Sequence, residues 1–287
     1  MNRSILSELW YKMVHSGSRM NLFIGINTIV FLFFVLINLI EFLFRVDIGI
    51  GTFLAINLAL PAYLPSLLYK PWTLFTYMFV HHDFLHFVFN MLALYWFGRI
   101  FEDFLNSRQF TFTYLAGGIV GGLLFIAFYN VFPAYQESVV YATVVGASAC
   151  VMAIIVATAT LLPDYNLHLL LFGSVPLKYL ALIYILIDVI GMTGMNAGGA
   201  IAHLGGALLG FVYIKRLRAG SDWSKIFQKK PKLKVIHRDN VTINTKITND
   251  IPEQEVIDRI LDKISQKGYQ SLTKQEKELL FKASKKE

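Results

Sequence analysis

The amino-acid sequence predicts an all-α fold: a polytopic membrane bundle of six transmembrane helices followed by a small helical tail. Of its 287 residues, 55% are hydrophobic, which is more than an ordinary soluble domain carries. The apolar residues gather before about residue 215 in long uncharged runs, each near the ~20 residues that cross a bilayer core. The chain after residue 216 is polar and charged, so we expect it to lie outside the membrane.

The elements follow from composition along the chain. Residues 1–20 mix basic and apolar side chains, which is typical of an amphipathic helix on a membrane surface. Residues 45–70 are apolar but are interrupted by two glycines and two prolines, so they predict a membrane-associated loop and not a span. The six expected spans, within a membrane domain of residues 21–216, are residues 21–44, 84–101, 109–131, 142–161, 177–193 and 199–214.

The tail divides into two parts. Residues 217–250 are basic and then polar, as in a linker, and residues 251–287 predict a cytoplasmic helical hairpin. Apolar residues recur at helical spacing from Val256 to Ile264, and Gly268 marks the stop of this first helix. Thr273 and Glu276 have the spacing of a capping box that opens the second helix. The sequence indicates no partner for this tail.

The positive charge follows membrane topology. The net charge is +7, but 18 of the 26 Lys and Arg residues lie from Lys215 onward. Most of the others flank the span ends that share one side when the chain crosses six times, which predicts that both termini are cytoplasmic. This distribution predicts the lipid bilayer as a partner and argues against nucleic-acid binding. With no sorting peptide at its N-terminus, the expected location is a bacterial cytoplasmic (inner) membrane.

Polar residues within the predicted spans are costly and often functional, and four of them stand out. His86 and Asn90 lie in the second span, Ser148 in the fourth and His203 in the sixth. These three spans run in the same direction, and His86, Ser148 and His203 each fall in the first third of their span. The sequence therefore places them at one depth near the outer face, with Asn90 one turn deeper on the His86 face.

This layer predicts a serine hydrolase. A serine hydroxyl needs a base to remove its proton, and histidine titrates in the suitable range. The backbone N–H of Ser148 and the side chains of His86 and Asn90 are candidate donors to an oxyanion. No carboxylate is expected near this layer, so a Ser148–His203 dyad is favoured over a triad. The prediction includes no metal and no cofactor, and because water must reach the layer, it includes a cavity open to the outside.

Small residues support a close approach of the fourth and sixth spans. Gly146 and Ala147 are expected to flank Ser148 on the fourth span. Ala202, Gly206 and Gly210 form a stripe of small residues on the sixth. Such residues let the backbones of two membrane helices come together, as a contact between a hydroxyl and an imidazole requires.

Three motifs make the sequence resemble the rhomboid family of intramembrane proteases over residues 60–215. They are Gly146-Ala147-Ser148-Ala149, then Ala202-His203-Leu204-Gly205-Gly206 with Gly210, and His81 with His86-x-x-x-Asn90 followed by Gly98-x-x-x-Glu102. The resemblance implies Ser148 as nucleophile, His203 as base, and His86 and Asn90 near the oxyanion hole. It also implies that the substrates are transmembrane segments of other proteins, cut near the outer face.

The sequence departs from the family pattern at two places. Ala149 stands where the family usually has glycine, and its methyl group leaves the backbone donor intact while narrowing the pocket. Residues 45–70 lack the Trp-Arg pair that the first loop of the family often carries.

The sequence supports other functions less well than proteolysis. A catalytically inactive rhomboid-like protein that binds or escorts membrane proteins is the main alternative, but such proteins commonly lose the two residues that are retained here as Ser148 and His203. A transporter predicts polar groups at the midplane and an internal repeat, and no repeat is found. A metal site at His81, His82 and His86 is disfavoured because these residues have no standard zinc spacing and lack carboxylate or thiolate partners.

Overall fold

The structure is a computed structural model that describes residues 5–45, 49–169, 173–228 and 254–284. The chain separates into two compact units, residues 1–230 and residues 231–287, and each is described by itself. Almost all regular structure in the described residues is helical, as predicted.

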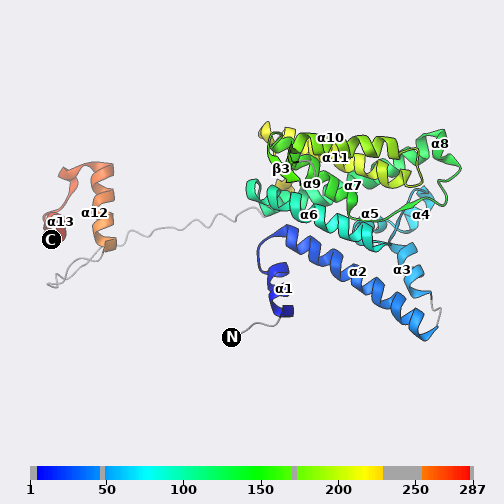
Figure 1. Cartoon of the computed structure of the whole chain (residues 1–287). Helices are drawn as coiled ribbons and strands as arrows, with labels where there is room; N and C mark the ends of the chain where they lie inside the picture. Colours follow the sequence, from blue (N-terminus) through cyan, green and yellow to red (C-terminus); the bar gives the residue numbers. More distant parts are fainter. Residues whose placement is uncertain (1–4, 46–48, 170–172, 229–253, 285–287) are drawn as a thin grey trace. The chain divides into compact units, whose positions relative to one another are not determined.

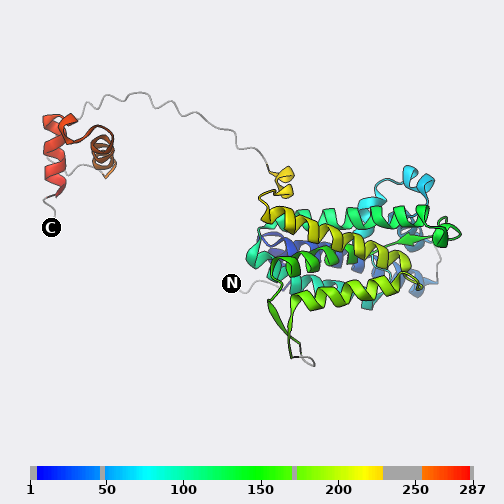
Figure 2. The ribbon, with the colours of Figure 1, turned by 90° about the horizontal axis from the view of Figure 1, so that it is seen from above.

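The first unit contains the predicted membrane bundle (Figures 1 and 2). Its α-helices are α1 (Ile5–Val14), α2 (Arg19–Phe44), α3 (Ile50–Leu58), α4 (Leu64–Tyr69), α5 (Thr73–Thr76), α6 (Phe84–Phe104), α7 (Ser107–Val131), α8 (Pro133–Gln136), α9 (Ser148–Leu161), α10 (Leu177–Gly191) and α11 (Ala197–Arg218). Two 3-10 helices, η1 (Tyr77–Phe79) and η2 (Trp223–Phe227), complete the helical elements of this unit.

Four of the described helices are long and apolar enough to cross a membrane: α2, α6, α7 and α11. They correspond to the expected first, second, third and sixth spans. The other two expected spans are shorter, since α9 has 14 residues and α10 has 15. At ~1.5 Å per residue each covers only ~21–23 Å, less than the ~30 Å of a bilayer core. In the described part of the expected loop, residues 45 and 49–70, the elements are short, namely α3, α4 and β1 (Leu60–Pro61).

Helix α9 lies inside the bundle, packed against α6, α7, α10 and α11 (Figures 1 and 2). Every residue from Ala149 to Ala159 is buried. A helix whose sides are enclosed by other helices does not face lipid along its length, so it need not span the whole bilayer core. This enclosure explains how a helix of only 14 residues occupies the centre of a membrane bundle.

The close packing of α9 and α11 depends on the predicted small-residue stripe. A Cβ atom at Gly206 would overlap the carbonyl oxygen of Ala149, and one at Gly210 would overlap that of Ala153. The backbones therefore approach to a distance that no larger residue permits. This contact brings the start of α9, with Ser148, next to the N-terminal half of α11, with His203.

The start of α2 is tied to the end of α6 by one carboxylate. Glu102 accepts hydrogen bonds from the Ser18 hydroxyl at 2.6 Å and from the backbone N–H groups of Arg19 and Met20 at 2.6 and 3.1 Å. A carboxylate at a helix N-terminus satisfies donors that have no partner inside the helix. Glu102 thus holds the first span against the second.

Two short antiparallel strand pairs were not predicted. β1 pairs with β2 (Thr143–Val144), with Leu60 opposite Val144. β3 (Asn166–Leu169) pairs with β4 (Gly173–Pro176) in the link between α9 and α10 and projects from the bundle (Figure 2). Residues 142–147, which were expected to open the fourth span, are therefore not helical: Thr143 and Val144 form β2, and a bend and turn at Gly146 and Ala147 lead into α9.

The chain after α11 stays on the bundle for several residues before the linker. Asp222 pairs with Arg108 at the start of α7, with 2.9 Å between Oδ2 and Nη2. Its other oxygen accepts from the Tyr213 hydroxyl and from the fully buried Ser224. The linker expected from residue 217 therefore begins with a docked segment, and residues 229–250 of it lie outside the described residues.

The second unit is a helical hairpin in its described part, α12 (Gln254–Lys267), η3 (Tyr269–Ser271) and α13 (Lys274–Ser284). The capping box is present: the Thr273 N–H donates to Glu276 at 2.7 Å, and the Glu276 N–H donates to Thr273 Oγ1 at 3.3 Å. Lys263 on α12 donates to the same carboxylate at 2.7 Å. Gly268 takes a positive φ of 76° where α12 ends.

Candidate active site

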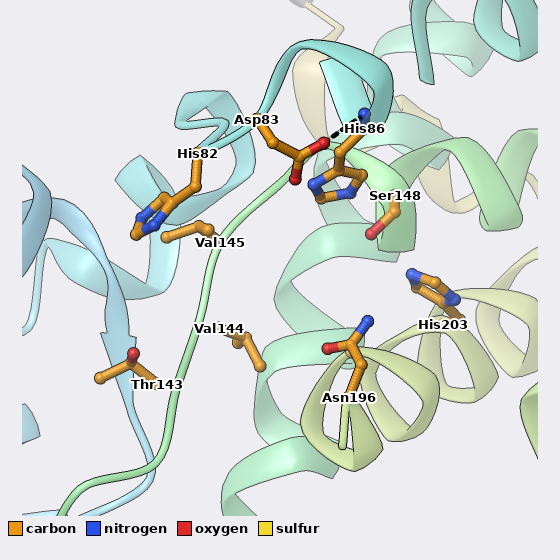
Figure 3. Close-up of a pocket in the computed structure, with 10 residues that line it drawn as sticks. His82, Asp83, His86, Thr143, Val144, Val145, Ser148, Asn196 and His203 are labelled. Atoms are coloured by element: carbon orange, nitrogen blue, oxygen red, sulfur yellow. Dashed lines mark hydrogen bonds between the residues drawn. The ribbon is translucent and has the colours of Figure 1, made fainter. Parts of the chain in front are cut away.

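A polar cavity of about 270 Å³ opens where four segments of the first unit meet (Figure 3). These segments are the start of α6, the extended chain around β2, the start of α9 and the start of α11. The residues that line it are His82, Asp83, His86, Thr143, Val144, Val145, Ser148, Asn196, Gly199 and His203. Three of the four predicted site residues, His86, Ser148 and His203, are therefore brought together at one cavity.

Ser148 is the first residue of α9. The preceding loop was expected to be helical, but Gly146 has φ +121°, a conformation that side chains disfavour. Two contacts hold this loop: the Gly146 N–H donates to the Tyr77 carbonyl at 2.9 Å, and the Ala147 N–H donates to His81 Nε2 at 3.3 Å. The helix therefore starts at Ser148 and leaves its backbone N–H among the unpaired donors of a helix N-terminus.

The Ser148 hydroxyl faces the cavity between His86 and His203 (Figure 3). None of the described residues forms a hydrogen bond with it. His86 lies in the first turn of α6, beside the cavity. Asp83 caps this helix by accepting a hydrogen bond from the His86 N–H at 2.8 Å. A Cβ atom at Gly146 would lie 2.7 Å from His86 Cε1 and 3.6 Å from Ser148 Oγ, so the missing side chain lets the imidazole approach the serine.

His203 has a carboxylate partner. Its Nδ1 atom lies 2.8 Å from Oδ1 of Asp188, a buried residue of α10. The expectation that no carboxylate lies near this layer is therefore wrong. When the carboxylate is ionised it can only accept a hydrogen bond, and in that arrangement Nδ1 is the donor and Nε2 is left with its lone pair. The sequence held a signal for this residue, because Asp188 is an ionisable group within the apolar run 177–191.

Asn90 does not line the cavity. Its side-chain amide donates to the carbonyl of His86 at 2.8 Å, one turn back on α6, and the residue is buried. The spacing of four residues does place Asn90 below His86, as expected, but the amide contacts the helix backbone. The structure thus separates Asn90 from the three residues that face the cavity.

Asn196 and Gly199 line the cavity although the sequence reasoning did not select them. They precede His203 by seven and four residues, and residues at this spacing share one face of a helix. Their spacing from His203 is the feature of the sequence by which these two residues could have been found.

Cys150 is a buried residue of α9 and is not part of the cavity wall. Among the residues that the structure describes, no three His, Cys, Asp or Glu side chains are grouped as metal ligands would be.

Comparison with known proteins identifies two regions of the chain. The family model of the Rhomboid domain matches residues 69–219, and a model described as a family of unknown function (DUF6576) matches residues 249–286. The chain is 31% identical over 157 residues to RHOMBOID-like protein 12, mitochondrial, of Arabidopsis thaliana, covering 52% of this chain and 47% of that protein. It is 29% identical over 143 residues to presenilin-associated rhomboid-like protein A, mitochondrial, of Danio rerio, covering 47% and 35%.

The chain thus aligns with less than half the length of each of these relatives. The Rhomboid match, in contrast, spans more than half of this chain and includes every residue of the cavity wall. Four described helices have the length and apolarity of membrane spans. The chain is therefore an integral membrane protein that belongs to the rhomboid family.

Proposed function

We propose that this protein is an intramembrane serine endopeptidase that hydrolyses peptide bonds in the transmembrane segments of other membrane proteins. One observation carries the proposal: Ser148 and His203 face the same cavity, and His203 is paired through Nδ1 with Asp188 at 2.8 Å. This arrangement leaves the Nε2 side of the imidazole for the serine. It supports a triad of Ser148, His203 and Asp188 in place of the expected dyad.

The chemistry follows from these roles. His203 Nε2 accepts the proton of the Ser148 hydroxyl while Oγ attacks the substrate carbonyl carbon. Asp188 stabilises the imidazolium that forms. The imidazolium then gives its proton to the leaving amine as the C–N bond breaks, which leaves an acyl group on Ser148. Water, deprotonated by His203, releases this acyl group and restores the serine.

Two groups support stabilisation of the oxyanion. The backbone N–H of Ser148 lies at the N-terminus of α9, where helix donors are unpaired and the helix dipole favours negative charge. The His86 side chain faces the same part of the cavity. Asn90 acts indirectly in this proposal, by bonding the His86 carbonyl.

The setting of the site is also a proposal. We place the cavity near the outer face, with six membrane-crossing segments and with both termini, including the hairpin of α12 and α13, in the cytoplasm. Most basic residues before the tail flank one set of span ends, and Arg45 and Lys70 are the exceptions. The bacterial cytoplasmic membrane expected from the sequence stays a prediction, and the two relatives above are named as mitochondrial proteins.

The test is cleavage of a tagged single-span reporter by the purified full-length protein in proteoliposomes. Ser148→Ala and His203→Ala are expected to abolish cleavage, with rates at least ~10³-fold lower. His168→Ala removes an exposed imidazole of β3 outside the cavity and serves as the matched control, with cleavage at the wild-type rate. Equal cleavage by Ser148→Ala would falsify the assignment of the nucleophile.

Labelling of Ser148 by a fluorophosphonate separates this function from the inactive alternative. The probe reports an activated serine even when the reporter is a poor substrate. A wild-type protein that binds the reporter, cleaves nothing and takes up no label would be a rhomboid-like binding or escort factor. Labelling that depends on His203 supports the protease.

A further inference from the structure

The strand pair between α9 and α10 has no part in the proposed chemistry. β3 and β4 form a two-stranded antiparallel sheet, in which Leu167 lies opposite Val175 and His168 lies opposite Ser174. This β3–β4 hairpin leaves the bundle at one end of the long helices and runs across their direction (Figures 1 and 2). Because the long helices cross the bilayer, a segment that runs across them extends along the plane of the membrane.

The root of the hairpin lies at the basic end of the bundle. Arg218, the last residue of α11, donates a hydrogen bond at 2.8 Å to the carbonyl of Leu161, the last residue of α9. The chain enters β3 soon after Leu161, and the last turn of α11 also carries Lys215 and Arg216. Basic side chains gather where membrane helices meet the headgroups. The hairpin therefore starts at the depth of the headgroups.

The two faces of the hairpin differ in chemistry. Leu167 and Val175 are opposite each other in the register, so their side chains share one face, the apolar face. The ladder continues toward α10, where the Leu177 N–H donates to the Tyr165 carbonyl at 2.9 Å. Alternation puts Leu177 on the apolar face as well. The opposite, polar face carries Pro176 and three exposed polar residues, Asn166, His168 and Ser174.

The apolar face is turned toward the bundle. Leu177 is completely buried in the hydrophobic core, and Leu167 packs against that core. Alternation along β4 directs Val175 to the same side and Ser174 to the other. Because the bundle spans the membrane, the side that faces the bundle also faces the bilayer. The polar face is turned away from the bilayer, toward water.

Three features fit the headgroup region better than the hydrocarbon core. A two-stranded sheet leaves one edge of each strand without backbone partners, which hydrocarbon does not tolerate and hydrated headgroups do. Tyr165 and Tyr179 flank the root and are 41% and 52% exposed, and tyrosine is enriched at this depth. Lys178 is paired with Asp164 at 2.6 Å, so this root residue does not add an unpaired charge.

We propose that the β3–β4 hairpin is an interfacial anchor, which lies in the plane of the membrane with its apolar face against lipid. The partner is the lipid surface at the boundary between headgroups and acyl chains. The anchor also holds the start of α10, because the Lys178 N–H donates to the carbonyl of Pro163 at 3.2 Å. This inference is independent of the proposed protease function, and its tests need no cleavage.

The first experiment measures the depth of single spin labels on the full-length protein in phosphatidylcholine liposomes. Val175→Cys carries the label on the apolar face, and Ser174→Cys, at the adjacent residue, is the matched control on the polar face. Cys150 is buried, and the unsubstituted protein gives its background labelling. Oxygen concentrates in lipid, so it should relax the Val175→Cys label more strongly than a water-soluble nickel chelate does. The order should reverse for Ser174→Cys.

The same contrast is expected in liposomes that contain phosphatidylglycerol, because the lipid-facing side is apolar and not basic. Stronger relaxation of the Val175→Cys label by nickel would place this face in water and overturn the proposal. Weak relaxation by both reagents would show that protein covers the face, which would overturn it in favour of a protein partner or a second copy. A contrast seen only with phosphatidylglycerol would also contradict an apolar anchor.

Hydrogen exchange supplies a test without a label. Val175→Asp puts a charge against acyl chains, so the amides of β3 and β4 in liposomes should exchange about tenfold faster than in wild type. Ser174→Asp puts the same charge on the polar face and should stay within about twofold of wild type. Unchanged exchange in α11 reports that the bundle is folded in both variants. Equal acceleration in the two variants, or none in Val175→Asp, would overturn the proposal.

Discussion

The Nδ1 atom of His203 on α11 lies 2.8 Å from Oδ1 of Asp188 on α10, and both side chains are largely buried. This contact pairs the imidazole of the proposed general base with a carboxylate of the neighbouring helix. It gives the imidazole a fixed orientation, with Nε2 directed away from α10. The most informative predictions concern this pair and the residues around it.

Asp188→Asn is expected to reduce reporter cleavage about 10²- to 10³-fold. The amide has no negative charge to stabilise an imidazolium, and its NH₂ group favours the tautomer in which Nε2 carries the proton. The measurement is kcat for the reporter in proteoliposomes. Asp164→Asn, which alters an exposed carboxylate paired with Lys178, is the control and should keep the wild-type rate. A rate for Asp188→Asn within threefold of wild type would show that a dyad is sufficient.

His86→Ala and Asn90→Ala are expected to differ in effect. His86 faces the cavity, so its removal should lower kcat by about 10²-fold if it is an oxyanion donor. Asn90 bonds the α6 backbone, so its removal should cost only a few-fold, roughly what one neutral hydrogen bond contributes. Single-turnover acylation rates measure both. Equal losses would mean that the Asn90 amide leaves the His86 carbonyl and reaches the substrate.

Gly206→Ala is expected to destabilise the bundle by about 1–3 kcal/mol. Its Cβ would overlap the Ala149 carbonyl oxygen, so α9 and α11 must move apart and carry Ser148 away from His203. Thermal unfolding in detergent should show a lower midpoint, together with lost cleavage. Gly191→Ala is the control, because its Cβ would meet only the Cβ of Ala200, at an ordinary 3.4 Å. An unchanged midpoint for Gly206→Ala would contradict the close helix contact.

Glu276→Gln is expected to loosen the hairpin of α12 and α13. The hydrogen bond from Lys263 and that from the Thr273 backbone hold the pKa of the Glu276 carboxyl below its ordinary value. A depressed pKa stabilises the folded hairpin at pH values above the unfolded pKa of about 4.3, and this contribution is lost as the pH falls through the lower folded value.

Hydrogen exchange of residues 254–284 in the full-length protein measures this effect. At neutral pH, Glu276→Gln should exchange faster than wild type, and the difference should shrink when the pH is lowered below the ordinary pKa of glutamate. Glu278→Gln is the control, because Glu278 makes only an exposed contact with Lys282 at 3.5 Å. A difference that persists unchanged in acid would show that the carboxylate charge is not what stabilises the hairpin.

Hydropathy predicted α2, α6, α7 and α11 to within a few residues, and helical periodicity predicted α12 and α13. It failed at α9, where the apolar run 142–161 contains both an extended segment and a helix. Apolar composition does not distinguish the two, and here the contacts of Gly146 with Tyr77 and of Ala147 with His81 decide the boundary. A boundary set by contacts with residues far away in the chain leaves no local pattern.

The sequence likewise predicted some residues of the candidate site and not others. His86, Ser148 and His203 could be selected because polar groups in apolar runs are costly, and their common depth follows from alternating span directions. Asn90 was selected by the same rule, but spacing along α6 cannot tell whether an amide turns to a cavity or to its own helix. Asp188 satisfied the same rule, since it is an ionisable residue in the predicted fifth span, but the expectation that no carboxylate lies near this layer left it out.

What the sequence by itself determined is the membrane bundle, the family resemblance and the three residues at the cavity, because a bilayer imposes long apolar runs and makes each polar exception conspicuous. Only the tertiary structure decided that α9 starts at Ser148, that Asp188 partners His203 and that the β3–β4 hairpin turns its apolar face to the bundle. These relationships depend on the direction of side chains and on backbones meeting within a few ångströms, which packing between distant segments sets and local composition does not encode.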